Sequence, residues 1–183
     1  MALMANHIEA ILSFWFDPYA KRHWFKSTDE FDASIRRSFE TICLSLAVMD
    51  KPNIDAPEEG LAAIICLDQF SRNMYRDTSA SFAWDSKAVY IAQIMVDKSW
   101  DVKLPQEQRH FIYLPFMHAE DLELQNLCVD LIDRRMGNEE ILKHAYNHKN
   151  IIEEFGRFPH RNKILGREST SQEKHFLSKW DGF

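Results

Sequence analysis

The sequence predicts an all-α fold, and three observations lead to this prediction. Apolar residues recur at helical spacing along most of the chain. No segment alternates apolar and polar residues in the way that a half-buried strand does. The 183 residues include only 5 glycines and 6 prolines, which leaves few turns and favours long helices. We therefore expect one domain over residues 1–183, built from about eight helices in antiparallel pairs.

Two helices are expected before residue 50. Residues 8–16 carry one apolar stripe at helical spacing, and Asp17-Pro18 then stops the helix. Residues 27–30 have the spacing of a capping box, in which a side chain at each end of the first turn satisfies a free backbone amide. The helix that this box opens carries apolar side chains at helical spacing as far as Met49.

Prolines mark the starts of two further helices. Pro57 suits the first turn of a third helix, which should run out near Leu67 and be followed by a loop over residues 72–78. A serine at position 79 or 81 is expected to cap a fourth helix. Pro105 opens a fifth helix, which must kink or end at Pro115 because a proline cannot donate to the preceding turn.

Three more helices are expected in the last third of the chain. The first covers roughly residues 120–136 and ends at a glycine, and the next covers 138–155 with Gly156 as its C-cap. Residues 170–173, Thr-Ser-Gln-Glu, form a second capping box and open a short last helix.

The composition argues against several classes of protein. A net charge of −6 opposes attraction of the whole surface to nucleic acid or to an anionic membrane, so neither is an expected partner. No run approaches the roughly 18 apolar residues that a membrane span needs. The apolar stretch at residues 8–16 ends in Asp17-Pro18 instead of a signal-peptide cleavage site. We expect a soluble cytoplasmic protein.

Neither the cysteines nor the glycines match a cofactor or redox motif. Cys43, Cys66 and Cys128 each stand among apolar neighbours without a Cys-x-x-Cys pair, which indicates buried, reduced thiols. The chain has no glycine-rich phosphate loop, nucleophile elbow or dinucleotide fingerprint. No cofactor is therefore expected.

The most informative stretch is residues 155–167, F-G-R-F-P-H-R-N-K-I-L-G-R. It contains six basic or amide side chains and no acidic residue, and its two glycines and its proline predict a shaped loop. Planar guanidinium groups suit carboxylate or phosphate, and a histidine can move a proton near neutrality. The predicted anion ligands are Arg157, Arg161, Asn162 and Arg167, with His160 as a catalytic candidate. Alternatively, the arginines fasten the last helix to carboxylates of neighbouring helices.

A second cluster, residues 113–121, follows the predicted break at Pro115. A carboxyl group at Glu120 beside an apolar wall would have a raised pKa and work as an acid or a base, with His118 as a second catalytic candidate. The alternative is that Glu120 and Asp121 occupy the first turn of the next helix, where negative charge is favourable.

The third cluster lies at the end of the third helix, in residues 67–73. Its polar side chains sit beside several apolar ones, which is unusual for a solvated helix end. Asp68 is a plausible partner for an arginine of the 155–167 loop, and local capping by Ser71 and Asn73 is the simpler reading. The predicted ligand-binding residues of this cluster are Asp68, Gln69, Arg72 and Asn73.

His144 and His148 are spaced for one helix face, which is a geometry that can hold zinc. A single pair without further ligands favours surface histidines instead, so no metal is expected. His148 shares its face with Ile152 and Phe155, and we place it toward the basic loop as a ligand-binding residue.

The three clusters together resemble one known family, the domain of unknown function numbered 924. The signatures are L-D-Q-F-S-R-N at residues 67–73, Y-L-P-F-M-H-A-E-D at 113–121 and F-G-R-F-P-H-R-N-x-x-L-G-R at 155–167. The resemblance covers nearly the whole chain. It implies an all-helical, tetratricopeptide-like superhelical stack, although the tetratricopeptide consensus itself is missing. It transfers no catalytic role to any residue.

Two functions fit these signatures. In the first, the three clusters converge on a polar pocket between helices that binds a small anionic metabolite, with acid–base chemistry as an added option. In the second, a tetratricopeptide-like scaffold binds a peptide or protein partner, and the signature arginines are purely structural. The sequence leaves the ligand, any reaction and the oligomeric state open.

Overall fold

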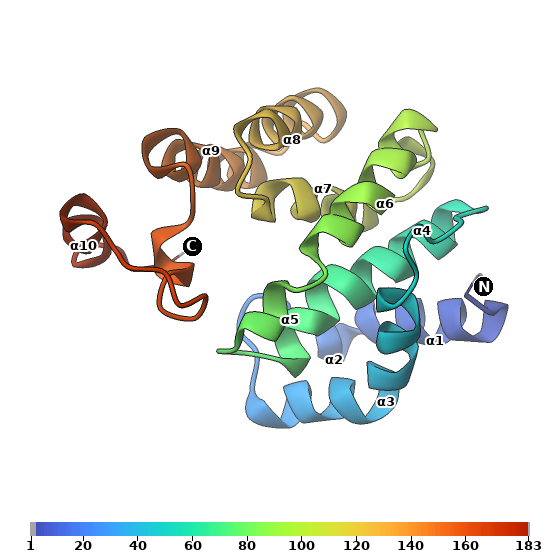
Figure 1. The fold of residues 1–183 in the computed structure, drawn as a ribbon. Helices are drawn as coiled ribbons and strands as arrows, with labels where there is room; N and C mark the ends of the chain where they lie inside the picture. Colours follow the sequence, from blue (N-terminus) through green and yellow to red (C-terminus); the bar gives the residue numbers. More distant parts are fainter. Residues whose placement is uncertain (1–2, 183) are drawn as a thin grey trace. The chain divides into compact units, whose positions relative to one another are not determined.

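The computed structural model describes residues 3–182, and these form helices, turns and connectors without a β-strand (Figure 1). The predicted all-α class is confirmed. The chain clusters into two compact units: the first takes in the chain up to Arg76 together with Ala80–Pro115, and the second takes in Asp77–Ser79 and the chain from Phe116 onward. A single domain and a tetratricopeptide-like superhelix both stay predictions.

The first unit begins with α1 (Ala5–Trp15), α2 (Pro18–Lys21) and α3 (Asp29–Ala47). The Asp17 side chain accepts a hydrogen bond from the Tyr19 amide and caps α2. The N-cap of α3 is Thr28, whose hydroxyl accepts from the amide of Phe31. Helix α3 therefore begins one residue later than the predicted capping box places it, and Ser27 donates to Asp32 instead of capping the helix.

One helical rod then contains three segments: α4 (Pro57–Ile64), a π-helix (Ile65–Phe70) and α5 (Ser71–Met74). The sequence predicted a loop from residue 72. Its predicted start is wrong, because the helix continues through the π-helical turns as far as Met74. A π-helix widens the helix by one residue per turn, and here it keeps Asp68 and Gln69 buried.

The rest of the first unit contains a 3₁₀ turn (Ser79–Phe82, which starts in the second unit), α6 (Asp85–Asp97), a second 3₁₀ turn (Asp101–Lys103) and most of α7 (Gln106–His118). Helix α6 follows Trp84, so the predicted serine cap is wrong. Helix α7 passes through Pro115 and continues for one turn, so the predicted alternative of an end at that proline is also wrong.

The second unit contains α8 (Leu122–Arg135), α9 (Glu139–Phe155), a 3₁₀ turn (Pro159–Arg161) and α10 (Ser171–Leu177). Helices α8 and α9 pack against each other. Gly156 ends α9 at φ +68°, the left-handed conformation that glycine adopts without strain. Thr170 and Glu173 form the predicted capping box of α10.

Each unit has a core of its own. In the first, the fully buried Trp15 ring packs edge-on against Phe70 and Phe111, with centroids 5.5 and 5.6 Å away. In the second, α9 and the following loop bury an apolar cluster against which α10 packs. Its members are Ile151, Ile152, Phe155, Phe158 and Phe176.

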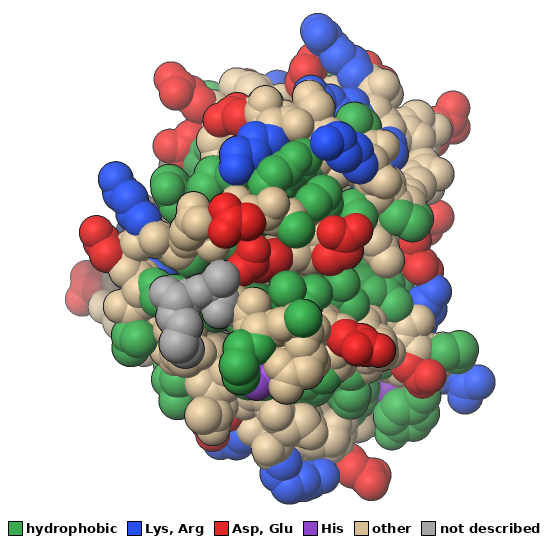
Figure 2. Space-filling view, turned by 90° about the vertical axis from the view of Figure 1, so that its right-hand side faces the viewer, with side chains coloured by type: hydrophobic (Ala, Val, Ile, Leu, Met, Phe, Trp, Pro, Cys, Tyr) green, Lys and Arg blue, Asp and Glu red, His purple; other side chains and the backbone are tan. Residues whose placement is uncertain are grey.

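The surface in Figure 2 mixes acidic, basic and hydrophobic side chains, as is usual for a solvated protein face. None of the helices within residues 3–182 combines the length and the hydrophobicity that a bilayer crossing requires. All three cysteines are free thiols and buried, as the sequence predicted.

Candidate functional site

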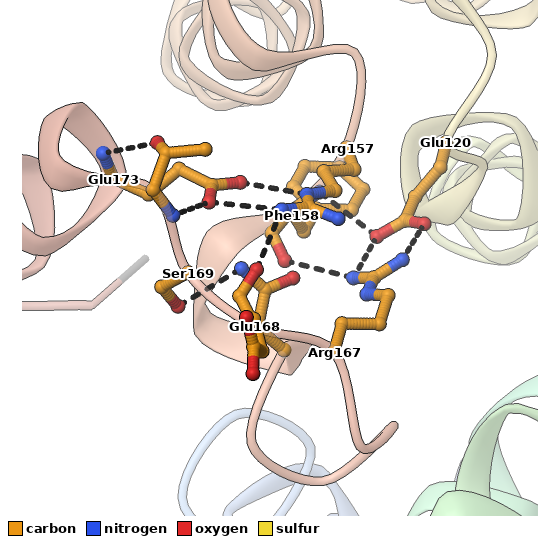
Figure 3. Close-up of polar contacts among 9 residues, drawn as sticks. Glu120, Arg157, Phe158, Arg167, Glu168, Ser169 and Glu173 are labelled. Carbon is orange, nitrogen blue, oxygen red and sulfur yellow. Dashed lines mark hydrogen bonds and ion pairs between the residues drawn. The ribbon is translucent and has the colours of Figure 1, made fainter.

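The clearest polar contact of the second unit joins the segment before α8 to the 155–167 loop. Arg167 donates to both carboxylate oxygens of Glu120, with Nη1–Oε2 at 2.6 Å and Nη2–Oε1 at 2.9 Å (Figure 3). The amide of Phe158 donates to Oε1 of the same carboxylate at 2.8 Å. Three donors on one carboxylate make this contact an anchor for the loop.

The electrostatics of Glu120 follow from these donors. Burial alone would raise the pKa of Glu120. The hydrogen bonds from Arg167 and Phe158, together with the positive charges of Arg167 and Arg161, outweigh burial and lower that pKa. The raised pKa predicted from the sequence is therefore wrong, because hydrogen-bond donors from Arg167 and Phe158 surround the carboxyl group. Its catalytic role stays a prediction.

A second anchor holds α10. Arg157 donates from Nε and Nη2 to the two carboxylate oxygens of Glu173, at 2.7 and 2.9 Å, and from Nη2 to the carbonyl of Glu168 at 3.0 Å (Figure 3). The amide of Thr170 donates to the same carboxylate at 2.7 Å. The hydrogen bonds from Arg157 are the main reason that the pKa of Glu173 falls to about 2. One glutamate thus serves the capping box and the arginine together.

Three cationic or titratable side chains surround the ring of Phe158, and a fourth lies beside one of them. His148 and His160 have ring centroids 5.7 and 5.5 Å from the Phe158 ring, and the guanidinium of Arg161 lies 4.5 Å from its centroid. The ring of His118, at the end of α7, lies 6.4 Å from that of His148. We call His118, His148, His160 and Arg161 the histidine cluster. Its members come from α7, α9 and the 3₁₀ turn, so three separate segments build it.

His148 is held as a neutral ring of defined tautomer. Its Nδ1 lies 2.8 Å from the carbonyl oxygen of His144, one turn back on α9, so Nδ1 carries the proton and donates it. Burial, together with the positive charge that Arg161 and the neighbouring histidines can carry, lowers the pKa of His148 to about 3, although the bond to His144 opposes this. Nε2 is then the unprotonated nitrogen near neutrality.

His160 is half-buried and stacks on Trp180 of the C-terminal segment, with ring centroids 4.4 Å apart and an interplanar angle of 14°. Burial and the charge of Arg161 lower the pKa of His160 to about 4, and Glu120 opposes that shift. His160 is therefore also neutral at pH 7, and it is more open to solvent than the buried His148.

Asn162 is almost fully buried beside the cluster. Its side-chain Nδ2 donates to the Ser169 hydroxyl at 3.0 Å, and its backbone carbonyl oxygen accepts from the Arg167 backbone amide at 2.8 Å. Its Oδ1 has no hydrogen-bond partner among the described residues. A buried acceptor of this kind can take a donor from a ligand or from a water molecule.

The third predicted cluster lies in the first unit. Arg72 donates from Nη1 and Nη2 to the two carboxylate oxygens of Asp85, both at 3.0 Å, and its Nη1 lies 2.9 Å from Oδ1 of the fully buried Asp68. Gln69 Nε2 donates to Oδ2 of Asp68 at 2.5 Å. The ligand-binding roles predicted for these residues, and the pairing of Asp68 with an arginine of the 155–167 loop, stay predictions.

Of the remaining side chains of this cluster, Ser71 bonds locally but Asn73 bonds to a distant segment, so the predicted local capping is wrong for Asn73. Asn73 Nδ2 donates to Asp32 at 2.7 Å and to the Ser27 hydroxyl at 3.2 Å, which joins α5 to the start of α3. The hydroxyl of Ser71 donates to the carbonyls of Leu67 and Asp68 within the π-helix. The Ser71 contacts stabilise the helical rod from within, and the Asn73 contacts fasten it to α3.

In residues 3–182, no three His, Cys, Asp or Glu side chains are arranged to hold a metal ion. The His144 side chain is exposed, and its role in the structure is that of its carbonyl, which orients His148.

Sequence reasoning missed three residues of this region. Phe158 contacts both His148 and His160. Trp180 stacks on His160, and Glu173 is the partner of Arg157. Only Glu173 gave a signal, because the capping box placed it at the start of α10. Trp180 lies in a segment without periodicity, so no pattern in the sequence pointed to its contact with His160.

The chain resembles known proteins over nearly its whole length. A family model described as bacterial protein of unknown function (DUF924) matches residues 11–181. The solved structure of a protein of unknown function, ATU0120 from Agrobacterium tumefaciens, is 34% identical, has a TM-score of 0.88, and aligns over 96% of this chain and 99% of that chain. No curated protein gave a significant match. Both matches agree with the family that the signature motifs indicated.

Proposed function

This chain belongs to the DUF924 family of bacterial proteins of unknown function, and we propose that its second unit binds a small anion at the histidine cluster. The observation that supports this proposal is the histidine cluster itself: three of its side chains contact the ring of Phe158, and His118 lies beside His148. Carboxylate and phosphate groups match these donors. The expected ligand class is a small phosphorylated or carboxylated metabolite.

The neighbouring arginines have a different role in the proposal. Arg157 and Arg167 each hold a carboxylate of this unit with two nitrogens, so they position the loop that carries Arg161. Glu120 is likewise a positioning residue, because three donors occupy its carboxylate. The ligand then contacts the histidine cluster and the buried Oδ1 of Asn162.

Proton transfer is an extension of this proposal. His148 and His160 are neutral at pH 7, so each can accept a proton from a bound molecule. His118, whose ring lies 6.4 Å from that of His148, is the third titratable ring of the cluster. A reaction that moves a proton next to a carboxylate or phosphate fits this arrangement.

The second candidate function is a helical scaffold for a peptide or protein partner. The observation that favours it is the pairing of Arg72, Arg157 and Arg167 with carboxylates, as expected if the signature arginines are fasteners. In this version Arg161 is a fastener too. Its replacement would then destabilise the fold by several kcal/mol and leave no small-molecule effect to lose.

A thermal-shift screen with Arg161→Met distinguishes the two functions. The panel contains inorganic phosphate, sulfate, di- and tricarboxylates and sugar phosphates. A ligand at about 100 times its Kd adds roughly 2.7 kcal/mol, or about 5 to 10 °C for a chain of this size. We expect one anion class to stabilise the wild type and to lose this effect in Arg161→Met.

The matched control is Arg134→Met on α8, because the Arg134 side chain is 74% exposed and pairs with Asp130, one turn away on the same helix. It should keep the full ligand effect. If no anion stabilises the wild type and Arg161→Met unfolds at much lower denaturant concentration, the scaffold function replaces the anion site.

A further inference from the structure

We infer that the histidine cluster takes up one proton for each anion it binds and that His160 holds that proton. This inference rests on the proposed anion site and specifies how its affinity is regulated. It assigns His160 a role that differs from those of His118 and His148, which share the cluster.

His160 faces charged or titratable groups from every part of the second unit that lies near it. Arg161 and Arg167 come from its own loop, His118 from α7, His148 from α9, and Glu120 from the segment before α8. The carboxylate of Glu120 is already held by Arg167. A proton on His160 therefore adds positive charge to a site where the charge of Arg161 opposes it most strongly.

A bound anion reverses this balance. It places negative charge against Arg161 and the histidine rings, so it favours the charged form of a ring that is otherwise kept neutral. The neutral state of His160 is the state without ligand, because its pKa lies at about 4. Binding then raises this pKa. At pH values between the pKa of His160 in the free protein and its pKa in the complex, each bound anion brings in a proton.

His148 is a poorer acceptor for this proton. It is more deeply buried than His160, and the pKa of its ring is lower, at about 3. Its Nδ1–H donates to the His144 carbonyl and fixes the tautomer. That bond favours the charged ring, but burial outweighs it.

Trp180 supports a charged His160. An imidazolium over the face of an indole is stabilised by the cation–π interaction, and the two rings lie parallel with centroids 4.4 Å apart. The stack also supplies a reporter, because a protonated imidazole quenches the fluorescence of an indole in contact with it. Binding of an anion should therefore decrease the emission of Trp180.

The sign of the pH effect follows from the uptake. Affinity for the anion rises as pH falls toward the pKa of His160 in the free protein, by up to about tenfold for each pH unit when one full proton is taken up. Affinity becomes independent of pH above the pKa of His160 in the complex.

The test is isothermal titration calorimetry of the full chain with sulfate, an anion that does not itself change protonation near neutrality. Titrations in buffers of different ionisation enthalpy, at several pH values between about 4.5 and 7, give the number of protons taken up. We expect uptake that approaches one proton per sulfate at the lower pH, with tighter binding. His160→Asn should abolish the uptake, and the exposed His175→Asn on α10 should keep it.

The outcomes separate this inference from the function on which it rests. If sulfate, phosphate and carboxylates all fail to bind at any pH, the anion site itself is wrong. Binding without proton uptake would overturn the inference and leave the site in place. Uptake that persists in His160→Asn would assign the proton to another ring. If that variant does not fold, ¹⁵N spectra of the wild-type histidine rings with and without sulfate show which ring gains a proton.

Discussion

Glu120 and Arg167 lie 47 residues apart in the sequence, yet two nitrogens of the arginine hold both oxygens of the glutamate, at 2.6 and 2.9 Å. This contact ties the segment that follows α7 to the 155–167 loop, the signature loop of this chain. Because the Phe158 amide joins the same carboxylate, the pair also fixes the ring around which the histidine cluster is arranged.

Glu120→Gln should therefore destabilise the protein by roughly 2 kcal/mol at pH 7, since it weakens charge-assisted hydrogen bonds and leaves Arg167 without its counter-charge. The pKa of Glu120 is lower in the folded state than in the unfolded state, so its contribution is present above the unfolded value and is lost as pH falls through the folded value. Urea unfolding at pH 7 and in acid should show a gap between wild type and variant that closes in acid.

The exposed Glu123 of α8 provides the control for this experiment. Glu123→Gln should stay within about 0.5 kcal/mol of the wild type at both pH values. Equal losses in the two variants would mean that the Arg167 contact contributes no specific stability.

Arg157→Met should loosen α10. Arg157 is the side chain that joins this short helix to the signature loop through Glu173, and a helix of 7 residues is marginal without tertiary contacts. We expect faster amide hydrogen exchange over residues 168–177, with little change in α8. The apolar contact between Phe155 and Phe176 should keep α10 attached, so the effect is local.

Lys174→Met tests whether any loss of charge on α10 has the same effect, because this lysine is exposed on the same helix. It should leave the exchange rates of α10 near those of the wild type. Uniform acceleration across α8, α9 and α10 in Arg157→Met would contradict the local role.

Gly60→Ala should destabilise the first unit by about 1 to 3 kcal/mol, although alanine is the better helix former. A Cβ atom at position 60 would lie 2.2 Å from the sulfur of Met95 and 3.2 Å from a methyl group of Ile54. The glycine is therefore required by the close approach of α4 and α6 and not by its backbone angles. Chemical denaturation of the single variant measures the cost.

A double variant separates this clash from other effects. Met95→Val removes the sulfur from the contact, so Gly60→Ala should cost less in the Met95→Val background than in the wild type. Additive losses would show that the Met95 side chain moves aside without penalty.

The sequence allowed prediction of those parts of the fold that depend on local signals. The Thr170 capping box and the Gly156 C-cap were predicted correctly because each involves residues within one helical turn. The π-helix at Ile65–Phe70 and the passage of α7 through Pro115 were not, because packing in the folded unit overrides the local preference there.

The candidate site shows the same limit. Composition alone predicted that the arginines of the signature loop would meet carboxylates or an anion. It did not predict that Arg167 pairs with Glu120 and Arg157 with Glu173, because partner choice depends on contacts between distant segments. The three histidines were candidates from the start, but their arrangement around Phe158 required the structure.

His148 gives the last prediction, which concerns stability in mild acid. In the folded state burial holds its pKa near 3, well below the ordinary value of 6.5, whereas the unfolded chain binds a proton near that value. The unfolded state therefore binds more protons as pH falls below about 6.5, and folding stability decreases.

One such histidine lowers the unfolding free energy by up to about 1.4 kcal/mol per pH unit. Urea unfolding between about pH 6.5 and 5 should show that the wild type loses on the order of 1 to 2 kcal/mol more than His148→Gln, which keeps the similar contribution of His160. A glutamine keeps a donor for the His144 carbonyl without a group that titrates. An equal pH slope in the variant would mean that His148 already carries a proton in the folded protein.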